Sequence, residues 1–242
     1  MARKRRVRLR ALVDELARRY LDIQDPRRLI VRGDVLVDGI KRTNPSSIVR
    51  RGAAITLRKE PRLRGEAKLR AAIAEFQVDV RGRVALDVGA AAGGFTRVLL
   101  AEGASRVYAV DAGHGQLLGS LRQDERVVNL EATNLAALNR TLIPDVIEIV
   151  AVDLSYLPLH EAAAQLERVT LAPKADLVAL VKPQFELRLA YPPARDDELE
   201  AAVDSARRGF EARHWYVRGV MRSPVRGARG AVEFLLWARR KG

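Results

Sequence analysis

The feature that most constrains the fold of this chain is a regular alternation, from residue 84 onward, of short apolar runs with amphipathic stretches. Short runs rich in Val, Ile and Leu are typical of strands buried on both faces of a sheet, and the stretches between them have helical spacing. Alternating strands and helices are joined by right-handed crossovers, which make the strands parallel. We therefore predict an α/β fold with helices on both faces of a parallel sheet. The predicted strands are Val84–Val88, Val107–Val110, Val127–Leu130, Ile147–Val152 and Leu177–Val181, and the predicted helices are 94–102, 115–122, 158–168 and 196–213.

The C-terminal part of the chain departs from this alternation. Two strands, Trp215–Met221 and Val232–Ala238, are predicted there, joined by the Arg- and Gly-rich loop RSPVRGARG. A short loop between consecutive strands makes them antiparallel. An antiparallel terminal pair on a parallel sheet is typical of Rossmann-like class I methyltransferases rather than of dinucleotide dehydrogenases.

Positive charge is concentrated in the first quarter of the chain. Residues 1–64 hold 19 basic and 7 acidic side chains, whereas the remainder of the 242 residues is close to neutral and the total is +13. This distribution predicts a small basic domain over residues 1–58, a charged linker over residues 59–66 and a larger domain over residues 67–242. A basic surface of this kind favours a polyanionic partner, although a merely solvated face has the same composition.

Several classes of protein are disfavoured by composition. No apolar run reaches the roughly 18 residues of a membrane-spanning helix, and charges interrupt the start of the chain where a signal peptide would be apolar. Cysteine is absent and the three histidines are scattered, so we predict neither a disulfide framework nor a metal site. We expect a cytoplasmic protein without a membrane partner. Its oligomeric state stays open.

The basic domain combines two helices with a strand–turn–strand segment. Asp25 and Pro26 form a helix start, Gly33 ends that helix, and Asp38-Gly39 is a hairpin turn. The segment RRLIVRGDVLVDGIKRTNPSSIV resembles the S-four-type RNA-binding domain, named after a ribosomal protein, over about residues 7–58. The resemblance implies binding of structured RNA. The candidate RNA-binding residues are Arg8, Arg10, Arg18, Arg19, Arg27, Arg28, Arg32, Lys41 and Arg42.

A glycine-rich segment, DVGAAAGGFT, follows the first strand of the larger domain and opens a helix. Small residues here allow a tight turn and a close approach to a ligand at the carboxyl edge of the sheet. The Gly-x-x-x-Gly-Gly spacing differs from the dinucleotide motif, and Asp87 suits an ammonium group better than a pyrophosphate. Asp111 ends the next strand, where it can accept hydrogen bonds from a ribose. A tight turn without a ligand is the alternative.

These features predict S-adenosyl-L-methionine as the cofactor. An adenine pocket is expected near Glu131 to Asn134. The candidate cofactor-binding residues are Asp87, Gly89, Ala90, Gly93, Gly94, Phe95, Asp111, Asn134 and Asp153.

Four charged residues form a candidate catalytic set. Asp153 and Lys182 follow two of the predicted strands, and Glu233 interrupts an apolar run of the last predicted strand. A carboxylate inside an apolar run needs a cationic partner, and Lys68 lies on a helix that could reach it. Each residue taken alone is also compatible with an ordinary charge at a strand end.

The larger domain resembles the FtsJ-like ribose 2′-O-methyltransferases, and the whole chain resembles the TlyA-type family of haemolysins and ribosomal RNA methyltransferases. The matching segments are RGEAKL, LDVGAAAGGFTRVLL, VDAGHGQLLGSLRQDERVVNLEATN, VDLSYL, LVKPQFE and VEFLLW. The resemblance implies methyl transfer to a ribose 2′-hydroxyl of ribosomal RNA, free or in a ribosomal subunit. It implies a catalytic tetrad of Lys68, Asp153, Lys182 and Glu233. Lys182 would be the base, Lys68 a neighbouring cation, and the two carboxylates would fix the ammonium groups.

Two segments depart from the family pattern. After Glu186 the chain reads LRLAYPPARDDELEAAV, without the glycines usual there, and Glu66 stands in the motif around Lys68 where a small residue is usual. A non-catalytic RNA-binding protein that retains a methyltransferase fold therefore stays open as an alternative. A membrane-active haemolysin is disfavoured, because the apolar face of the N-terminal helix is narrow and is needed within its own domain.

Overall fold

The structure, a computed structural model, describes residues 9–21, 23, 25–57 and 63–242. Arg8, one of the candidate RNA-binding residues, lies outside this range. The chain divides into two compact units, Met1–Arg62 and Leu63–Gly242. Each unit has its own apolar core, and we describe each by itself.

The smaller unit packs two helices against short antiparallel strands. Its core contains apolar side chains from both helices and from the strands, among them Leu12, Leu16, Ile30 and Val35. Strand β2 lies between β3 and β5, and β1 pairs with β4. The elements are β1 (Leu9–Ala11), α1 (Leu12–Arg19), α2 (Pro26–Arg32), β2 (Val35–Val37), β3 (Ile40–Arg42), β4 (Ile48–Arg50) and β5 (Ile55–Leu57).

The helix and turn signals of this unit are confirmed. The Asp25 carboxylate accepts a hydrogen bond of 2.9 Å from the backbone N–H of Arg28, which caps α2. Gly33 ends the helix with a left-handed φ of 77°. Asp38 and Gly39 both have positive φ, which gives the turn between β2 and β3 the twist that antiparallel strands require.

The larger unit is a seven-stranded sheet with helices on both faces. The strand order is β11-β12-β10-β9-β6-β7-β8, and only the contacts of β12 with β10 and β11 are antiparallel. The elements are α3 (Arg64–Phe76), β6 (Val84–Val88), α4 (Gly94–Ala101), β7 (Arg106–Val110), α5 (Gly119–Arg122), β8 (Val127–Leu130), η1 (Leu135–Ala137), β9 (Ile147–Val152), α6 (Leu159–Leu166), β10 (Leu171–Val181), α7 (Pro183–Glu186), α8 (Asp196–Glu211), β11 (Trp215–Arg222), η2 (Ala228–Gly230) and β12 (Phe234–Arg240).

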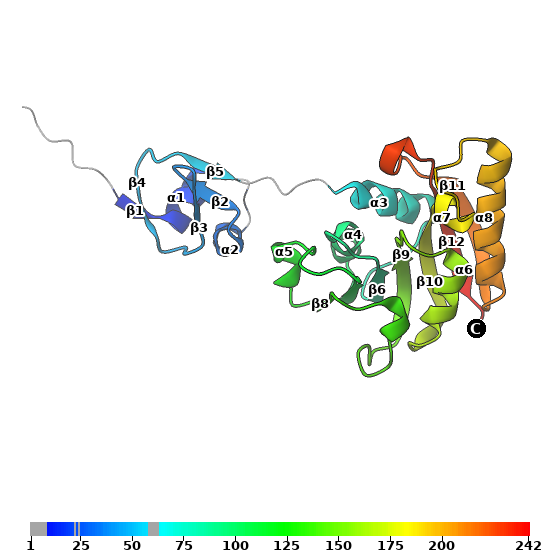
Figure 1. Ribbon diagram of the computed structural model, residues 1–242. Helices are drawn as coiled ribbons and strands as arrows, with labels where there is room; N and C mark the ends of the chain where they lie inside the picture. Colours follow the sequence, from blue (N-terminus) through cyan, green and yellow to red (C-terminus); the bar gives the residue numbers. More distant parts are fainter. Residues whose placement is uncertain (1–8, 22, 24, 58–62) are drawn as a thin grey trace, which may run out of the picture. The chain divides into compact units, whose positions relative to one another are not determined.

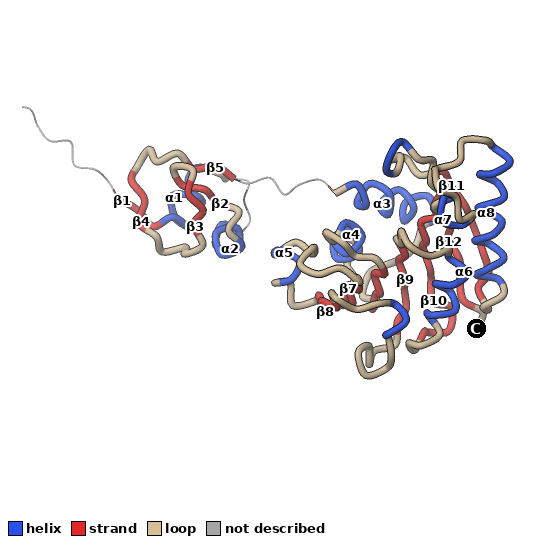
Figure 2. The backbone as a smooth tube through the Cα atoms, in the orientation of Figure 1, coloured by secondary structure: helices blue, strands red, loops and turns tan. Residues whose placement is uncertain are grey.

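Two apolar layers hold this sheet between its helices. One layer contains side chains of α3 and α4, and the other contains side chains of α6 and α8 (Figures 1 and 2). Successive residues of a strand point to opposite faces, so a strand covered on both faces is apolar throughout. The predicted α/β fold with an antiparallel terminal pair is therefore confirmed.

Four local predictions need correction. Strand β10 begins at Leu171, six residues before the predicted start at Leu177. Helix α5 has only the four residues Gly119–Arg122 instead of residues 115–122, because the backbone N–H groups of Gln116 and Leu117 donate to the Glu131 carboxylate. Helix α3 begins at Arg64, inside the predicted linker of residues 59–66. Strand β12 begins at Phe234, so Glu233 precedes the strand that was predicted to contain it.

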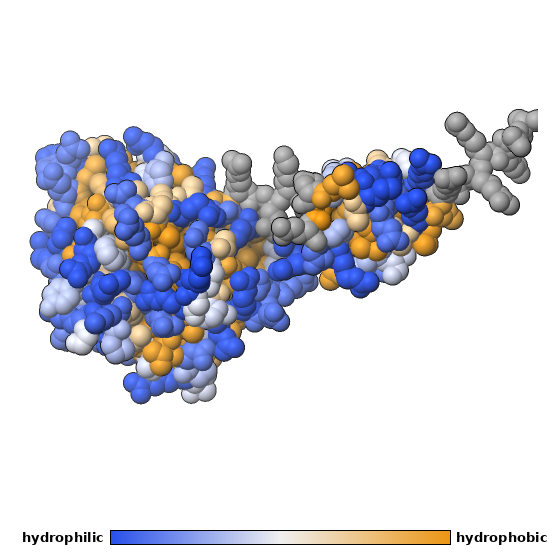
Figure 3. Space-filling view, turned by 180° about the vertical axis from the view of Figure 1, so that it is seen from behind, coloured by the Kyte–Doolittle hydropathy of each residue, from blue (hydrophilic) through white to orange (hydrophobic). Residues whose placement is uncertain are grey.

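No helix within the described part of the chain is both long and apolar enough to cross a membrane. On the face of the larger unit seen in Figure 3, hydrophilic side chains lie between the apolar ones.

Candidate active site

Two neighbouring cavities lie at the carboxyl edge of the sheet, where ligands of open α/β folds bind. We call them the acidic cavity, of about 210 Å³, and the basic cavity, of about 400 Å³. Ser155 lines both. The acidic cavity is lined by Val88, Gly89, Ala91, Val110, Asp111, Ala112, Thr133, Leu135, Asp153, Leu154, Ser155 and Tyr156. The basic cavity is lined by Arg64, Lys68, Ser155, Lys182, Pro183, Gln184, Phe185, Pro192, Gly227, Ala228, Arg229, Ala231, Val232 and Glu233.

The floor of the acidic cavity depends on Gly89. Its φ is +86°, and a Cβ atom there would collide with the carbonyl oxygen of Asp153. The backbone N–H of Asp153 also donates to Val88 O at 2.9 Å, which holds the ends of β6 and β9 together. Only glycine satisfies both the left-handed conformation and the close approach.

Asp111 ties two loops around the acidic cavity. Its carboxylate accepts hydrogen bonds from the backbone N–H of Ala91 at 2.8 Å and of Gly113 at 2.7 Å. Glu131 supports the second loop through Gln116 and Leu117, and its side-chain hydrogen bond from Asn129, together with those backbone donors, lowers the pKa of Glu131 to about 2. The cavity therefore presents two carboxylates, Asp111 and Asp153, on a backbone fixed by hydrogen bonds.

The four predicted catalytic residues form two ion pairs. Lys68 Nζ lies 2.6 Å from Glu233 Oε2, and these side chains are only 8% and 6% exposed. Lys182 Nζ lies 2.6 Å from Asp153 Oδ1, with side-chain exposures of 15% and 23%. Each pair thus joins a lysine to a carboxylate from a distant part of the chain.

Lys182 connects the two cavities. It lines the basic cavity, pairs with Asp153 of the acidic cavity, and donates a hydrogen bond of 2.6 Å to the hydroxyl of Ser155. Its ammonium group is therefore at the boundary between a site that suits cations and a site that suits anions. A group transferred from one cavity to the other would pass beside this nitrogen.

Residues 61–240 match the model of the FtsJ-like methyltransferase family. The chain belongs to this family. It is 39% identical over 242 residues to the 16S/23S rRNA (cytidine-2′-O)-methyltransferase TlyA of Mycobacterium tuberculosis. The aligned region covers 95% of this chain and 90% of the relative. Hemolysin A of Brachyspira hyodysenteriae is 33% identical, over 86% of this chain and 89% of the relative.

A solved structure of a hemolysin-named protein from Streptococcus thermophilus has a TM-score of 0.70 and 28% identity. The matched region covers 96% of this chain and 89% of the chain in the solved structure. The similarity to this solved structure and to the TlyA sequence therefore extends over both units.

Six candidate cofactor residues of this FtsJ-like methyltransferase do not line the acidic cavity. Asp87 is fully buried and accepts a hydrogen bond of 2.6 Å from Thr96 Oγ1. Burial raises the pKa of Asp87 to about 7, and the nearby carboxylates of Asp153 and Asp111 act in the same direction. Asp87 is therefore buried beneath the turn, where Thr96 is its hydrogen-bond partner.

The other five of these six shape the surroundings of the cavity. Phe95 and Ala90 belong to the apolar core between the sheet and α4. Gly93 has a φ of +94°, and a Cβ atom there would collide with Leu121. Gly94 lies against Gly65 of α3, and Asn134 caps η1 by accepting a hydrogen bond from the backbone of Ala136.

Residues that the sequence reasoning missed line the acidic cavity instead. Ser155 and Tyr156 directly follow Asp153, and Thr133 and Leu135 flank Asn134. The segment around Asp153 was the available signal, because residues that follow a parallel strand lie at the same sheet edge as its last residue.

The two segments that depart from the family pattern have structural roles. The Glu66 carboxylate accepts hydrogen bonds from the backbone of Leu63 at 3.1 Å and from Arg97 at 2.7 Å, which fixes the start of α3. In the segment after Glu186, Gln184 Nε2 donates to Ala190 O at 3.1 Å. Pro192 of the same segment lines the basic cavity, so this segment shapes its wall without glycines.

The candidate RNA-binding residues of the smaller unit fall into two groups. Arg18 and Arg19 hold the buried Glu15, and their guanidinium groups, Arg18 foremost, lower the pKa of Glu15 to about 2. Arg32 pairs with Asp34 at 3.0 Å. The other described members, Arg10, Arg27, Arg28, Lys41 and Arg42, are all exposed, and so is Arg18 despite its ion pair.

Proposed function

We propose that this FtsJ-like methyltransferase transfers a methyl group from S-adenosyl-L-methionine to a ribose 2′-hydroxyl of ribosomal RNA. The observation that carries the proposal is the junction of an acidic and a basic cavity at Lys182. Such a junction places a cationic methyl donor beside a polyanionic acceptor.

The acidic cavity fits this cofactor. S-adenosyl-L-methionine carries a sulfonium and an ammonium group, and Asp111 and Asp153 supply carboxylates for positive charge and for ribose hydroxyls. Gly89 leaves the space that a Cβ atom would fill. Bound there, the cofactor supplies a methyl group activated by the positive charge of its sulfur.

The basic cavity fits a nucleotide of RNA. Arg64 and Arg229 offer guanidinium groups that bind phosphate. The base is Lys182 in its neutral amine form, whose Nζ accepts the proton of the ribose 2′-hydroxyl and becomes the ammonium group that pairs with Asp153. Lys68, held by Glu233, adds a second positive charge without being free to move. Orientation of the hydroxyl towards the neighbouring cavity supplies much of the rate enhancement.

The substrate class follows from charge and from the relatives. The relative TlyA is named for the cytidine 2′-O-methylation of ribosomal RNA. In our proposal residues 1–58 form an S-four-type domain that binds structured RNA through its exposed basic side chains, and residues 67–242 carry out the transfer. A ribosomal substrate, free RNA or an assembled subunit, implies a cytoplasmic location.

Transfer of labelled methyl groups to ribosomal subunits and to protein-free ribosomal RNA tests the proposal. We expect Lys182→Ala to lower kcat by about 10²–10⁴-fold, the range of general base catalysis, with cofactor affinity little changed. Lys174→Ala is the matched control, because Lys174 is an exposed lysine at the other end of β10. Equal measurable rates for the wild type and Lys182→Ala would contradict the assignment of Lys182, whereas absence of transfer by the wild type would favour a non-catalytic RNA-binding protein.

A further inference from the structure

Arginine is unusually concentrated around strand β11. Residues 212–232 contain five arginines and no carboxylate, and the next acidic residue is Glu233. Most arginines elsewhere in the larger unit pair with carboxylates, as Arg83 does with Asp176 at 2.7 Å and Arg106 does with Asp145 at 2.9 Å. Residues 212–232 are therefore distinguished by having no acidic side chain among their arginines.

Four of these five arginines form what we call the arginine row. Arg213 pairs with Glu167 at 3.2 Å and is excluded. Within the described ranges, no ion pair with a carboxylate is formed by the other four, and all four are exposed. The row consists of Arg218, Arg222, Arg226 and Arg229.

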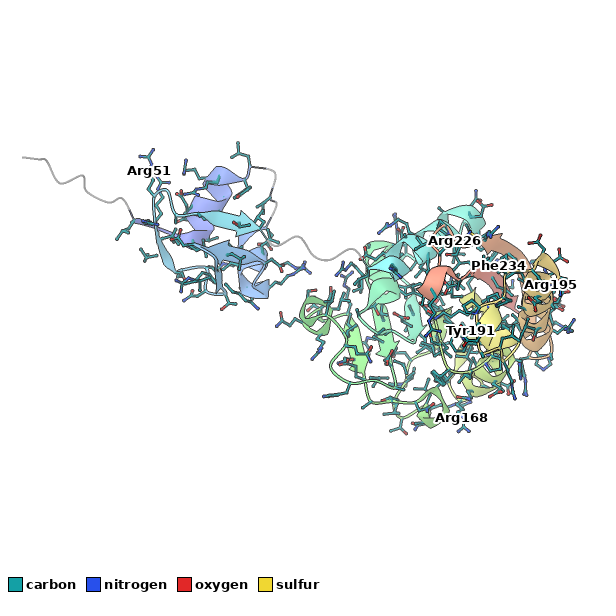
Figure 4. The ribbon with its side chains drawn as sticks, turned by 45° about the horizontal axis from the view of Figure 1, so that its top comes forward. Arg51, Arg168, Tyr191, Arg195, Arg226 and Phe234 are labelled. Carbon is teal, nitrogen blue, oxygen red and sulfur yellow. The ribbon has the colours of Figure 1, made fainter. Side chains whose placement is uncertain are left out.

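The arginine row leads to the basic cavity. Strand β11 is the free edge of the sheet and runs in the same direction as β10, so Arg222 lies at the carboxyl edge. Arg222 is opposite Phe234, and the backbone of Ser223 donates to Glu233 O at 2.9 Å. Arg218 lies about 13 Å further back along the strand. Figure 4 shows Arg226 and Phe234 at the same end of the larger unit.

The loop after β11 completes the row. Arg226 Nη1 donates to Gly230 O at 3.0 Å, which closes the loop on itself. Arg229 lines the basic cavity with a φ of 55°, a left-handed conformation that is costly for a residue other than glycine. The loop thus holds the Arg229 guanidinium at the cavity in a strained backbone conformation. Backbone strain of this kind is typical of functional sites.

Protection of the sheet edge does not explain the row by itself. Charged side chains on an edge strand prevent pairing with another chain, but either sign of charge serves that purpose. Here every charge from Arg213 to Arg229 is positive, and Arg229 at the end of the row lines the cavity proposed for RNA. Phosphate is the ligand that guanidinium groups bind in two parallel hydrogen bonds.

We propose that the arginine row binds the phosphate backbone of the RNA that flanks the target nucleotide. The proposal rests on the proposed function and adds a second RNA-binding surface, on the methyltransferase unit itself. RNA held along β11 enters the basic cavity at Arg229, so the row adds affinity for the flanking RNA while the cavity itself orients the target ribose beside Lys182. The row acts on RNA affinity and leaves the chemical step unchanged.

The test compares two double variants with equal changes in charge. Arg218→Gln with Arg222→Gln removes two charges from the row. Arg140→Gln with Arg168→Gln removes two exposed charges elsewhere, and Figure 4 shows Arg168 at the opposite end of the larger unit. We expect the row variant to raise KM for RNA on the order of tenfold with kcat and cofactor affinity unchanged. The slope of log Kd against log salt concentration should fall in magnitude by about 1.5 for protein-free ribosomal RNA.

Three outcomes would overturn one proposal or the other. Equal KM, Kd and salt slope for the two double variants would overturn the arginine row. A loss of affinity for subunits but not for protein-free RNA would overturn it in favour of a ribosomal protein as partner. If the wild type transfers no methyl group to any ribosomal RNA, the proposed function fails, while the RNA-binding measurement still decides whether the row binds RNA.

Discussion

The acidic and basic cavities share Ser155 and one edge of the sheet, yet they present opposite charges. The acidic cavity offers Asp111 and Asp153 without a lysine or arginine in its lining, whereas the basic cavity offers two lysines and two arginines with Glu233 as its one acid. One sheet edge thus presents an acidic lining and a basic lining side by side. Lys182 and Asp153 form the ion pair across the boundary.

The two cavities are also built from different parts of the chain. The acidic cavity is formed by the ends of the neighbouring parallel strands β6, β7 and β9 and by the loops that follow them. The basic cavity draws on α3, α7, η2 and the residues before β12. Because separate elements supply the two sets of charges, each cavity can be altered with little effect on the other.

The largest effect that would test this independence is expected at Gly89. In Gly89→Ala the new Cβ atom collides with the carbonyl oxygen of Asp153, so the end of β9 must move. We expect the Kd for S-adenosyl-L-methionine, measured by calorimetry, to rise at least about 100-fold, while RNA affinity is retained.

Gly115→Ala is the matched control for this variant. Gly115 also has a positive φ, of +71°, but a Cβ atom there meets no atom within 4 Å. It should therefore show only the small penalty of the left-handed backbone. Similar cofactor affinities for the two variants would show that the close approach at Gly89 does not shape the cofactor site.

A smaller effect is expected from the charges that distinguish the cavities. Asp111→Asn removes one carboxylate from the acidic cavity and should weaken cofactor binding about tenfold, the loss of one charge-assisted hydrogen bond. Arg64→Gln should instead raise the Kd for RNA by a similar factor, through loss of a phosphate contact. Cofactor calorimetry and RNA anisotropy on both variants measure the comparison. An effect of either variant on both ligands would contradict separate sites.

The smallest effect is a change in the pH dependence of stability. Burial raises the pKa of Asp87 to about 7 from an ordinary value of 3.8, so the folded chain binds one more proton than the unfolded chain between these pH values. Asp87 therefore makes the free energy of unfolding fall as pH rises through this window, by at most about 1.4 kcal/mol per pH unit.

Asp87→Asn tests this sign directly. Urea unfolding at pH 5, 6 and 7 should show a shallower fall with pH for the variant than for the wild type. Glu186, whose pKa burial also raises to about 7, is present in both proteins, so the difference isolates Asp87. Parallel pH profiles would mean that Asp87 is ionised within the fold.

The sequence predicted the strands of the sheet well for a physical reason. Three predicted strands, Val84–Val88, Val127–Leu130 and Ile147–Val152, have the observed bounds, because a strand buried on both faces must be apolar throughout. The same reasoning indicated the sheet edge at which Asp153 and Lys182 meet. It could not show which carboxylate pairs with which lysine, since side-chain reach depends on packing between distant segments.

Residues with polar or small side chains were harder to place. Asp87 and Phe95 lie in a motif typical of cofactor binding, yet both point into the interior. Glu233 was placed in a strand because apolar residues surround it, whereas it precedes β12 and is buried through its contact with Lys68. A run of apolar or small residues predicts that a segment is buried. It does not show whether the buried side chains contact a ligand or the protein core.

The position of β12 in the sheet has a consequence for the order in which the sheet can form during synthesis. This strand follows the other strands of its sheet in the sequence, yet it lies between β11 and β10, and Glu233 just before it meets Lys68, 165 residues earlier in the chain. A nascent chain still lacking β12 has an open gap in its sheet and an unpaired lysine in its basic cavity. The sheet and the basic cavity are therefore completed only once β12 has been synthesised and has inserted between its two neighbours.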